Sequence, residues 1–384
     1  MKCPGWQVGA GRGFGAPRMY VQGPGELDRL GEHVSRYGTE AFLLLDGFVL
    51  DSMGDRVRHS LSKAGVRATI ERFGGECSAC EIERVSTLAK AERTQNVVGV
   101  GGGKTLDTAK CVAVETQAAM IVVPTIASTD APCSAIAVRY TPEGVLDRGL
   151  FLHRNPDLVL VDSAVVVQAP VRFLASGMGD ALSTWYEARS NTDAARDNFV
   201  GERYSPTAAG LAVARQCHKV LLRDGVAAKV AAEAGALTPA VEAIIEANTL
   251  LSGIGFENCG VAAAHGVADA LGVLDPDHAF MHGEKVGFGV LCLLVLEGRE
   301  MGEFEEAFGF LKSIGLPTRL RDFGLDSSSA SDIDRLVGEA LADGASTWRV
   351  AAPVDHAKMR ASILAADAYA SRLVRGPARR WDYA

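Results

Sequence analysis

The sequence predicts a two-domain protein, with an N-terminal α/β domain around a doubly wound, mainly parallel sheet and an all-helical C-terminal domain. The 384 residues suggest two domains, because one domain usually has about 100–200 residues. Short apolar runs alternate with helical patterns over roughly the first 160 residues, which favours a parallel sheet. After Ala169, strand signals become scarce and apolar residues recur at helical spacing. We therefore expect a flexible glycine-rich start at 1–17, an α/β domain at 18–168 and a helical domain at 169–384.

Six runs of the first domain are predicted strands because they are short, apolar and bounded by turn residues, and several are rich in Val and Ile. They are Ala41–Asp46, Arg67–Phe73, Asn96–Gly101, Ala119–Thr125, Ser134–Tyr140 and Leu158–Asp162. Helical patterns lie between them at Glu26–Tyr37, Asp51–Ala64 and Glu81–Arg93. In the second domain, stretches such as VRFLASGMGDALSTWYEARS and EKVGFGVLCLLVLEG predict helices.

Composition and charge exclude several classes of function. A net charge of −8 argues against nucleic acid as the main partner. No apolar run reaches the roughly 18 residues of a membrane span, and the N-terminus lacks the apolar segment of a secretory signal. Eight cysteines without framework spacing indicate reduced thiols, and we interpret the isolated pair Cys77 and Cys80 as part of an ordinary loop. We expect a cytoplasmic protein with no membrane partner.

The segment VGVGGGKTLDTAK, from Val98 to Lys110, predicts a strand, a glycine turn and the start of a helix. Glycines let a phosphate approach the backbone, and a helix N-terminus offers free N–H groups. The spacing does not fit the GxGxxG fingerprint, because its third glycine position falls on Lys104 or Leu106. It does not fit the P-loop either, because three residues instead of four separate Gly99 from Gly103. A strand ending in Asp162 keeps a phosphotransferase open as an alternative. Spacing alone therefore predicts a nucleotide phosphate site and leaves the nucleotide undecided.

Three residues of the helical half are candidate metal ligands. Asp180, His265 and His282 each stand beside small or apolar residues in helix-prone stretches. Three protein ligands leave a position open for substrate, as a catalytic metal requires. His278, four residues before His282, competes as a ligand, and a single histidine on such a face is often a core residue.

Six segments occur together in order, and they are GGGKTLDTAK, PTIASTDAPCSAIAVRY, GMGDALSTWYEA, IEANTLLSGIGFEN, AAAH and HGEKVGFG. Together they resemble the glycerol dehydrogenases, the zinc-dependent branch of the iron-containing alcohol dehydrogenase family, from about Arg18 onward. The resemblance implies a Rossmann-like NAD domain and a helical metal-binding domain, a fold shared with dehydroquinate synthase. It implies NAD-dependent oxidation of glycerol or a similar small vicinal diol to the hydroxyketone (dihydroxyacetone), and the reverse. Relatives are often octamers, so the resemblance also implies a homo-oligomer.

The same resemblance implies roles for individual residues. The implied cofactor-binding residues are Asp46, Gly102, Gly103, Lys104, Thr105, Asp107, Thr125, Ser128, Ser134, Ile136, Val138 and Tyr140. The anion of Asp46, on the adenine ribose, would repel the extra phosphate of NADP, so NAD is expected. The implied metal ligands are Asp180, His265 and His282. Asp130 and His265 would contact the substrate, and these four residues form the implied catalytic set.

Two departures and two alternatives accompany the resemblance. Thr184 stands where iron-using relatives often carry a fourth ligand, so Zn²⁺ is expected over Fe²⁺ or another divalent metal. Ala268 and Asp269 replace the His and Asn of the relatives' AAAHAxHNG, which leaves open another small polyol or hydroxyketone as substrate. A cyclase like dehydroquinate synthase would need several basic residues, and we find only Lys285 near the two histidines. A nucleotide-binding protein without catalysis is disfavoured by the intact ligand set.

Overall fold

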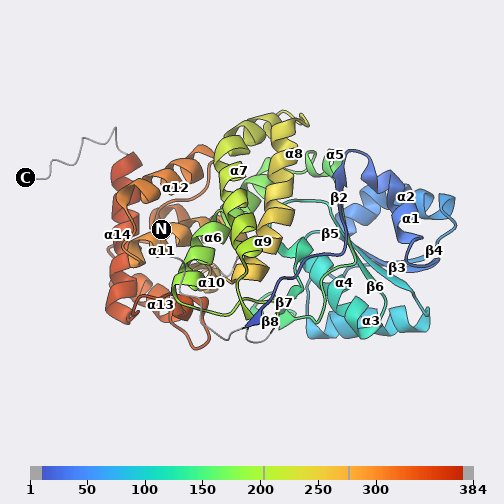
Figure 1. Ribbon diagram of the computed structural model, residues 1–384, viewed down its shortest axis with the longest axis horizontal. Coiled ribbons are helices and arrows are strands. Elements are labelled where there is room, and N and C mark those ends of the chain that lie inside the picture. Colours follow the sequence, from blue (N-terminus) through green and yellow to red (C-terminus); the bar gives the residue numbers. More distant parts are fainter. Residues whose placement is uncertain (1–10, 202–203, 276, 375–384) are drawn as a thin grey trace, which may run out of the picture.

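The structure is a computed structural model that describes residues 11–201, 204–275 and 277–374, and it has an α/β half and a helical half (Figure 1). The α/β half is built on a six-stranded parallel sheet of order β2-β9-β6-β5-β3-β4. Its strands are β2 (Tyr20–Gly23), β3 (Glu40–Leu45), β4 (Arg67–Arg72), β5 (Asn96–Gly101), β6 (Ala119–Pro124) and β9 (Leu158–Asp162). The predicted fold class, a parallel α/β domain followed by a helical domain, is thereby confirmed.

Helices cover both faces of this sheet, which explains why its central strands are buried along their whole length and almost entirely apolar (Figure 1). Successive side chains of a strand point to opposite faces. Leu43 and Leu45 of β3 accordingly pack with the helices of one face, whereas Phe42 and Leu44 pack with those of the other. The first face carries η1 (Glu26–Arg29), α1 (Leu30–Val34) and α2 (Gly47–Lys63), and the second carries α3 (Ala79–Ala91) and α4 (Gly103–Glu115).

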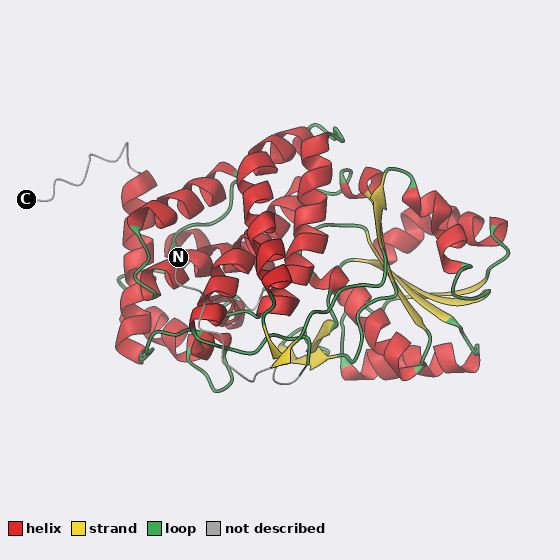
Figure 2. Cartoon of the chain, in the orientation of Figure 1, coloured by secondary structure: helices red, strands yellow, loops and turns green. Residues whose placement is uncertain are grey.

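The predicted strand at Ser134–Tyr140 lies outside the parallel sheet. Residues Ile136–Tyr140 form β7, which pairs in antiparallel register with β8 (Leu146–Phe151) (Figure 2). A short 3₁₀ turn, η2 (Ala131–Cys133), precedes this hairpin. Neither β2 nor β8 was predicted, because β2 is a short, half-buried edge strand and β8 is mostly exposed and carries charged residues.

The helical half packs around one continuous core. Its helices are α5 (Ser163–Val166), α6 (Val171–Asp193), α7 (Ala208–Glu233), α8 (Pro239–Glu246), α9 (Ser252–Cys259), α10 (Ala263–Val273), α11 (His282–Leu296), α12 (Met301–Ser313), α13 (Ala330–Ala340) and α14 (His356–Val374). A π-helical turn, η3 (Ala247–Leu251), joins α8 to α9, and two 3₁₀ turns are η4 (Leu320–Phe323) and η5 (Ser346–Arg349). None of the helices in the described ranges is long and apolar enough to cross a membrane.

Helices α6 and α11 touch through their backbones. A Cβ atom added to Gly283 would lie 1.8 Å from the Ser176 carbonyl oxygen and 2.9 Å from the Asp180 nitrogen. A Cβ atom on Gly179 would lie 2.3 Å from the Gly283 carbonyl oxygen. Because neither glycine has a side chain, the first turn of α11 can approach the middle of α6. This approach brings His282, the first residue of α11, next to Asp180.

The described N-terminal residues are tied to the helical half. Strand β1 (Gly11–Arg12) pairs in parallel with β10 (Tyr204–Ser205). The Asn258 side chain accepts a hydrogen bond from the Gly15 nitrogen at 2.9 Å and donates one to the Gly15 oxygen at 2.8 Å. The sequence predicted a flexible start through Pro17, but 11–15 are hydrogen-bonded, and 1–10 lie outside the described residues.

Candidate active site

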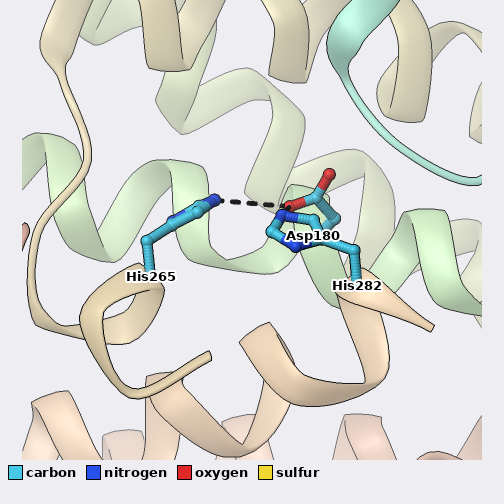
Figure 3. A group of neighbouring side chains, drawn as sticks. All are labelled: Asp180, His265 and His282. Carbon is cyan, nitrogen blue, oxygen red and sulfur yellow. Dashed lines mark ion pairs between the residues drawn. The ribbon is translucent and has the colours of Figure 1, made fainter. Parts of the chain in front are cut away.

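Asp180 of α6, His265 of α10 and His282 of α11 point toward one another (Figure 3). The Nε2 atoms of His265 and His282 lie 3.6 Å and 3.4 Å from Oδ1 of Asp180. One donor atom from each residue lies within 4.8 Å of the others. Oδ1 of Asp180 is buried without a hydrogen-bond partner, whereas Oδ2 accepts from the backbone nitrogen of Asp130 at 3.2 Å. The three residues thus surround one unsatisfied carboxylate oxygen.

The electrostatics of this triad favour a positive charge at its centre. Burial would lower the pKa of His282, but the charge of Asp180 raises it above its ordinary value. Burial would likewise lower the pKa of His265, and Glu187 and Asp180 raise it well above that value. Burial would raise the pKa of Asp180, but the two histidines, His282 foremost, hold it well below its usual range. The donor set of two imidazoles and one carboxylate with an orphan oxygen therefore fits a divalent cation.

Glu187 fixes the orientation of His265 and was not predicted from the sequence. Its Oε2 lies 2.7 Å from Nδ1 of His265, and its Oε1 accepts from the backbone nitrogens of Ala262 at 2.7 Å and His265 at 3.0 Å. A carboxylate at Nδ1 accepts the hydrogen of that nitrogen, so in the neutral ring Nε2 would present its lone pair to a metal ion. The available signal was its position two helical turns after Asp180, on the same face of α6.

Asp130 belongs to the α/β half and lies beside the three candidate metal ligands. It precedes η2, it is buried, and its Oδ2 accepts a hydrogen bond from the Ser252 hydroxyl at 2.9 Å. Burial, reinforced by the neighbouring negative charge of Asp180, raises the pKa of Asp130 to about 7. A carboxyl group with such a pKa can donate or accept a hydrogen bond near neutral pH. Asp130 therefore lies beside Asp180 of the metal-ligand triad, and its contact with substrate stays a prediction.

Solvent reaches the triad from one side. The His282 side chain is 42% exposed and that of His265 is 14% exposed, whereas Asp180 is fully buried. Asp269 lies one turn after His265 on α10 and is also exposed, whereas Ala268 is buried. Enough protein nevertheless surrounds Asp269 that desolvation raises the pKa of its carboxyl group. His282 and Asp269 are thus the exposed groups here, and Asp269 adds a negative charge that acts on both histidines.

In the glycine turn after β5, Gly101 is closely packed against its neighbours, whereas Gly103 has open space beside it. Gly101 has a positive φ of 156°, and a Cβ atom there would lie 2.9 Å from Cβ of Asp46. A Cβ atom on Gly103 would meet nothing nearer than the Thr129 hydroxyl at 3.6 Å. Gly102 is the N-cap of α4 and provides no side-chain cap, so the first N–H groups of this helix remain available. The turn therefore fits an approaching phosphate.

Asp46 lies directly beside this turn. Its backbone nitrogen donates to the Val100 oxygen at 3.1 Å, and its Oδ1 caps α2 by accepting from the Phe48 nitrogen at 2.9 Å. The contact of Asp46 with the adenine ribose stays a prediction. Of the other predicted cofactor residues, Thr105, Thr125 and Ser134 are buried, and Ser128, Ile136, Val138 and Tyr140 are partly exposed.

The Asp107 side chain bonds to neighbouring parts of the protein, whereas the sequence predicted that it would lie beside the phosphates. Its Oδ2 accepts from the Val138 nitrogen at 2.9 Å, and its Oδ1 pairs with Nζ of Lys110 at 3.0 Å. Lys110, which the sequence reasoning missed, is fully buried and also donates to the carbonyl oxygens of Ala131 at 2.6 Å and Ile136 at 2.8 Å. These bonds fix the loop before β7 onto α4.

Several candidates from the sequence have other partners. Asp162, considered as a Walker B residue, accepts from the backbone nitrogens of Gly25 and Leu27 at 3.0 Å and 3.1 Å. It also pairs with Arg56 at 2.9 Å, which opposes a phosphotransferase role. The Thr184 hydroxyl lies 2.7 Å from that of Ser252. His278 lies outside the triad.

Comparison with known proteins agrees with this geometry. Residues 17–163 match the family described as iron-containing alcohol dehydrogenase. The glycerol dehydrogenase of Thermotoga maritima is 48% identical over 354 residues, which cover 92% of this chain and 96% of that protein. The glycolaldehyde reductase of Halobacterium salinarum is 42% identical over 361 residues, which cover 94% and 98%. The crystal structure of a probable glycerol dehydrogenase from Sinorhizobium meliloti has a TM-score of 0.89 and 50% identity, covering 94% of this chain and 99% of that one.

These similarities extend along nearly the full length of each chain, so they include the helical half that carries the triad as well as the α/β half. They confirm the resemblance inferred from the six sequence segments. The chain therefore belongs to the iron-containing alcohol dehydrogenase family, in the group of glycerol dehydrogenases that its motifs indicated.

Proposed function

We propose that this protein is an NAD-dependent dehydrogenase that oxidises glycerol, or a similar small vicinal diol, to the hydroxyketone, and catalyses the reverse reduction. The observation that carries the proposal is the convergence of Asp180, His265 and His282 beside Asp130, with one orphan carboxylate oxygen among them. The family relationship supports the same reaction, because the Thermotoga maritima relative is named a glycerol dehydrogenase.

Asp180, His265 and His282 would hold the metal ion. A divalent ion there would act as a Lewis acid and lower the pKa of a substrate hydroxyl group. Zinc is the favoured metal because three protein ligands are typical of its catalytic sites, and Thr184 bonds to Ser252 instead of adding a ligand. Glu187 would accept the Nδ1 hydrogen of His265 in the metal-bound state, which leaves Nε2 to act as a ligand.

The uncapped start of α4 and the open glycine turn would bind the NAD pyrophosphate, with Asp46 on the adenine ribose. Residues of the β7 segment, whose Val138 is anchored by Asp107, would line the nicotinamide half of the cofactor. Asp130, whose pKa is raised to about 7 by burial, would orient a substrate hydroxyl and exchange a proton with it. Holding substrate and cofactor in one geometry supplies much of the rate acceleration.

A second candidate is a related reaction on a different small hydroxyaldehyde or polyol. The 42% identical relative from Halobacterium salinarum is named a glycolaldehyde reductase, and the exposed Asp269 adds a carboxylate near the triad. A cyclase is less well supported, because Lys285, the basic residue near the two histidines, is paired with Asp275 at 2.9 Å.

The test is NADH formation by the purified, zinc-loaded protein on addition of glycerol, with a chelator-treated sample as control. A panel of diols assayed with NAD, together with dihydroxyacetone and glycolaldehyde assayed with NADH, would rank the substrates. We expect chelator-sensitive turnover that is restored by zinc. Full activity after complete metal removal, or no activity on any member of the panel, would contradict the proposal.

A further inference from the structure

Lys104, the cation beside the glycine turn, is held by a carboxylate that the proposed reaction does not use. Its Nζ lies 2.5 Å from Oε2 of Glu76 and 5.0 Å from the centre of the Tyr140 ring. Glu76 belongs to the loop after β4, which also contains Cys77, whereas Cys80 lies in the first turn of α3 and not in a loop as the sequence predicted. The carboxylate of Glu76 therefore lies close to the glycine turn, where the anionic pyrophosphate of the cofactor is expected.

Glu76 is enclosed and anchored. Its side chain is only 16% exposed, compared with 45% for Lys104. Its Oε1 accepts from the Cys77 nitrogen at 3.1 Å, and a Cβ atom on Gly144 would lie 3.4 Å from Oε2 and 3.2 Å from Nε2 of His278. The turn between β7 and β8 and the His278 ring thus lie against this carboxylate. Little solvent is left to screen its charge.

We propose that Glu76 limits how tightly the protein holds the cofactor pyrophosphate, by neutralising part of the charge of Lys104. This inference rests on the proposed function, because it takes Lys104 as a phosphate-binding group. An ammonium group has three N–H donors, so Lys104 can keep Glu76 and still donate to a phosphate. The fixed carboxylate opposes the two negative charges of the pyrophosphate, and an enzyme that exchanges its cofactor in every cycle gains turnover from such weakening.

The first test measures binding of NADH and of ADP-ribose to the zinc-loaded protein, by fluorescence and calorimetry. We expect Glu76→Gln to lower the Kd for NADH about tenfold, mainly through slower dissociation, because one opposing charge is removed. The salt dependence of the Kd should also become steeper. Adenosine, which has no phosphate, should bind both proteins equally. Glu76→Asp, which keeps the charge, should stay close to the wild type.

A matched control and a double variant complete the design. Glu83→Gln removes the same charge from an exposed position on α3 and should leave all Kd values unchanged. In a Lys104→Gln background, Glu76→Gln should tighten NADH binding by about threefold or less, because the effect acts through the ammonium group.

The outcomes separate this inference from the proposed function. Unchanged or weaker NADH binding by folded Glu76→Gln would overturn the inference alone, as would an equal effect on adenosine. Failure of the wild-type protein to bind NADH would overturn the proposed function, and the inference with it.

Discussion

Replacement of Glu187 by Gln tests whether the carboxylate behind His265 controls the metal site. Oε1 of Glu187 accepts two backbone hydrogen bonds, from Ala262 at 2.7 Å and His265 at 3.0 Å, so the amide oxygen of the variant should take this position. The amide NH₂ group then lies 2.7 Å from Nδ1 of His265, where Oε2 was. A donor there forces Nδ1 to accept and moves the ring hydrogen to Nε2, the atom that faces Asp180.

The expected cost follows from this tautomer change. To bind a metal through Nε2, the His265 ring must carry its hydrogen on Nδ1 again. That N–H group then faces the N–H group of the variant's amide, and neither can accept a hydrogen bond from the other. The variant thus loses a charge-assisted hydrogen bond, and we expect about 10–100-fold weaker metal binding, or roughly 1.4–2.7 kcal/mol. The side-chain volume hardly changes, so we expect the fold to survive.

The assay is competition for Zn²⁺ with a chelator of known affinity, combined with metal stoichiometry by mass spectrometry. Glu257→Gln is the matched control, because Glu257 is equally buried in the helical half but bonds to Ala135 and Asn155 and to no histidine. We expect the control to bind zinc like the wild type. Wild-type affinity in folded Glu187→Gln would refute the tautomer argument.

Three further predictions concern the ligands, the cofactor and pH. Asp180→Ala and His265→Ala should each abolish metal retention and turnover, and full metal content in either variant would remove that residue from the ligand set. Asp46→Ala should relax the preference for NAD over NADP, measured as a ratio of kcat/KM values, and should cost about 1 kcal/mol through loss of the α2 cap. Burial raises the pKa of Glu257 to about 7 in the folded protein. Between pH 4.5 and 7 the folded protein therefore keeps a proton on Glu257 that the unfolded chain has lost, so the free energy of unfolding falls as the pH rises through this range. Denaturant titrations should show that loss, at most about 3 kcal/mol, in the wild type and not in Glu257→Gln.

The sequence predicted the central sheet well because its strands are covered on both faces. Runs such as NVVGVG and LVLVD are apolar except for Asn96 and Asp162 at their ends, and the structure buries every residue of β5 and β9. Strand β8 was missed for the opposite reason, since its residues are mostly exposed and polar side chains interrupt the pattern. The sequence pattern thus reveals buried strands most readily, although β4 was also predicted while its residues are exposed or partly exposed.

The site was less predictable because its groups come from distant parts of the chain. No spacing rule links Asp180, His265 and His282, so residue types alone made them candidate ligands and the resemblance of several motifs together made the site specific. Glu187 and Lys110 were missed because their roles depend on partners that folding brings to them. Asp107 was assigned to phosphate by its place in a motif, but its side chain bonds to Lys110 and the β7 backbone.

The pairing of β1 with β10 has a consequence for how the chain can be divided. Gly11–Gly15 lie before the entire α/β half, yet they complete the edge at Tyr204–Ser205 and satisfy the amide of Asn258. A fragment starting at Val171 would leave these polar groups open to water. The helical half is thus no interchangeable module, and exchanging it between relatives would require moving this leading segment together with it.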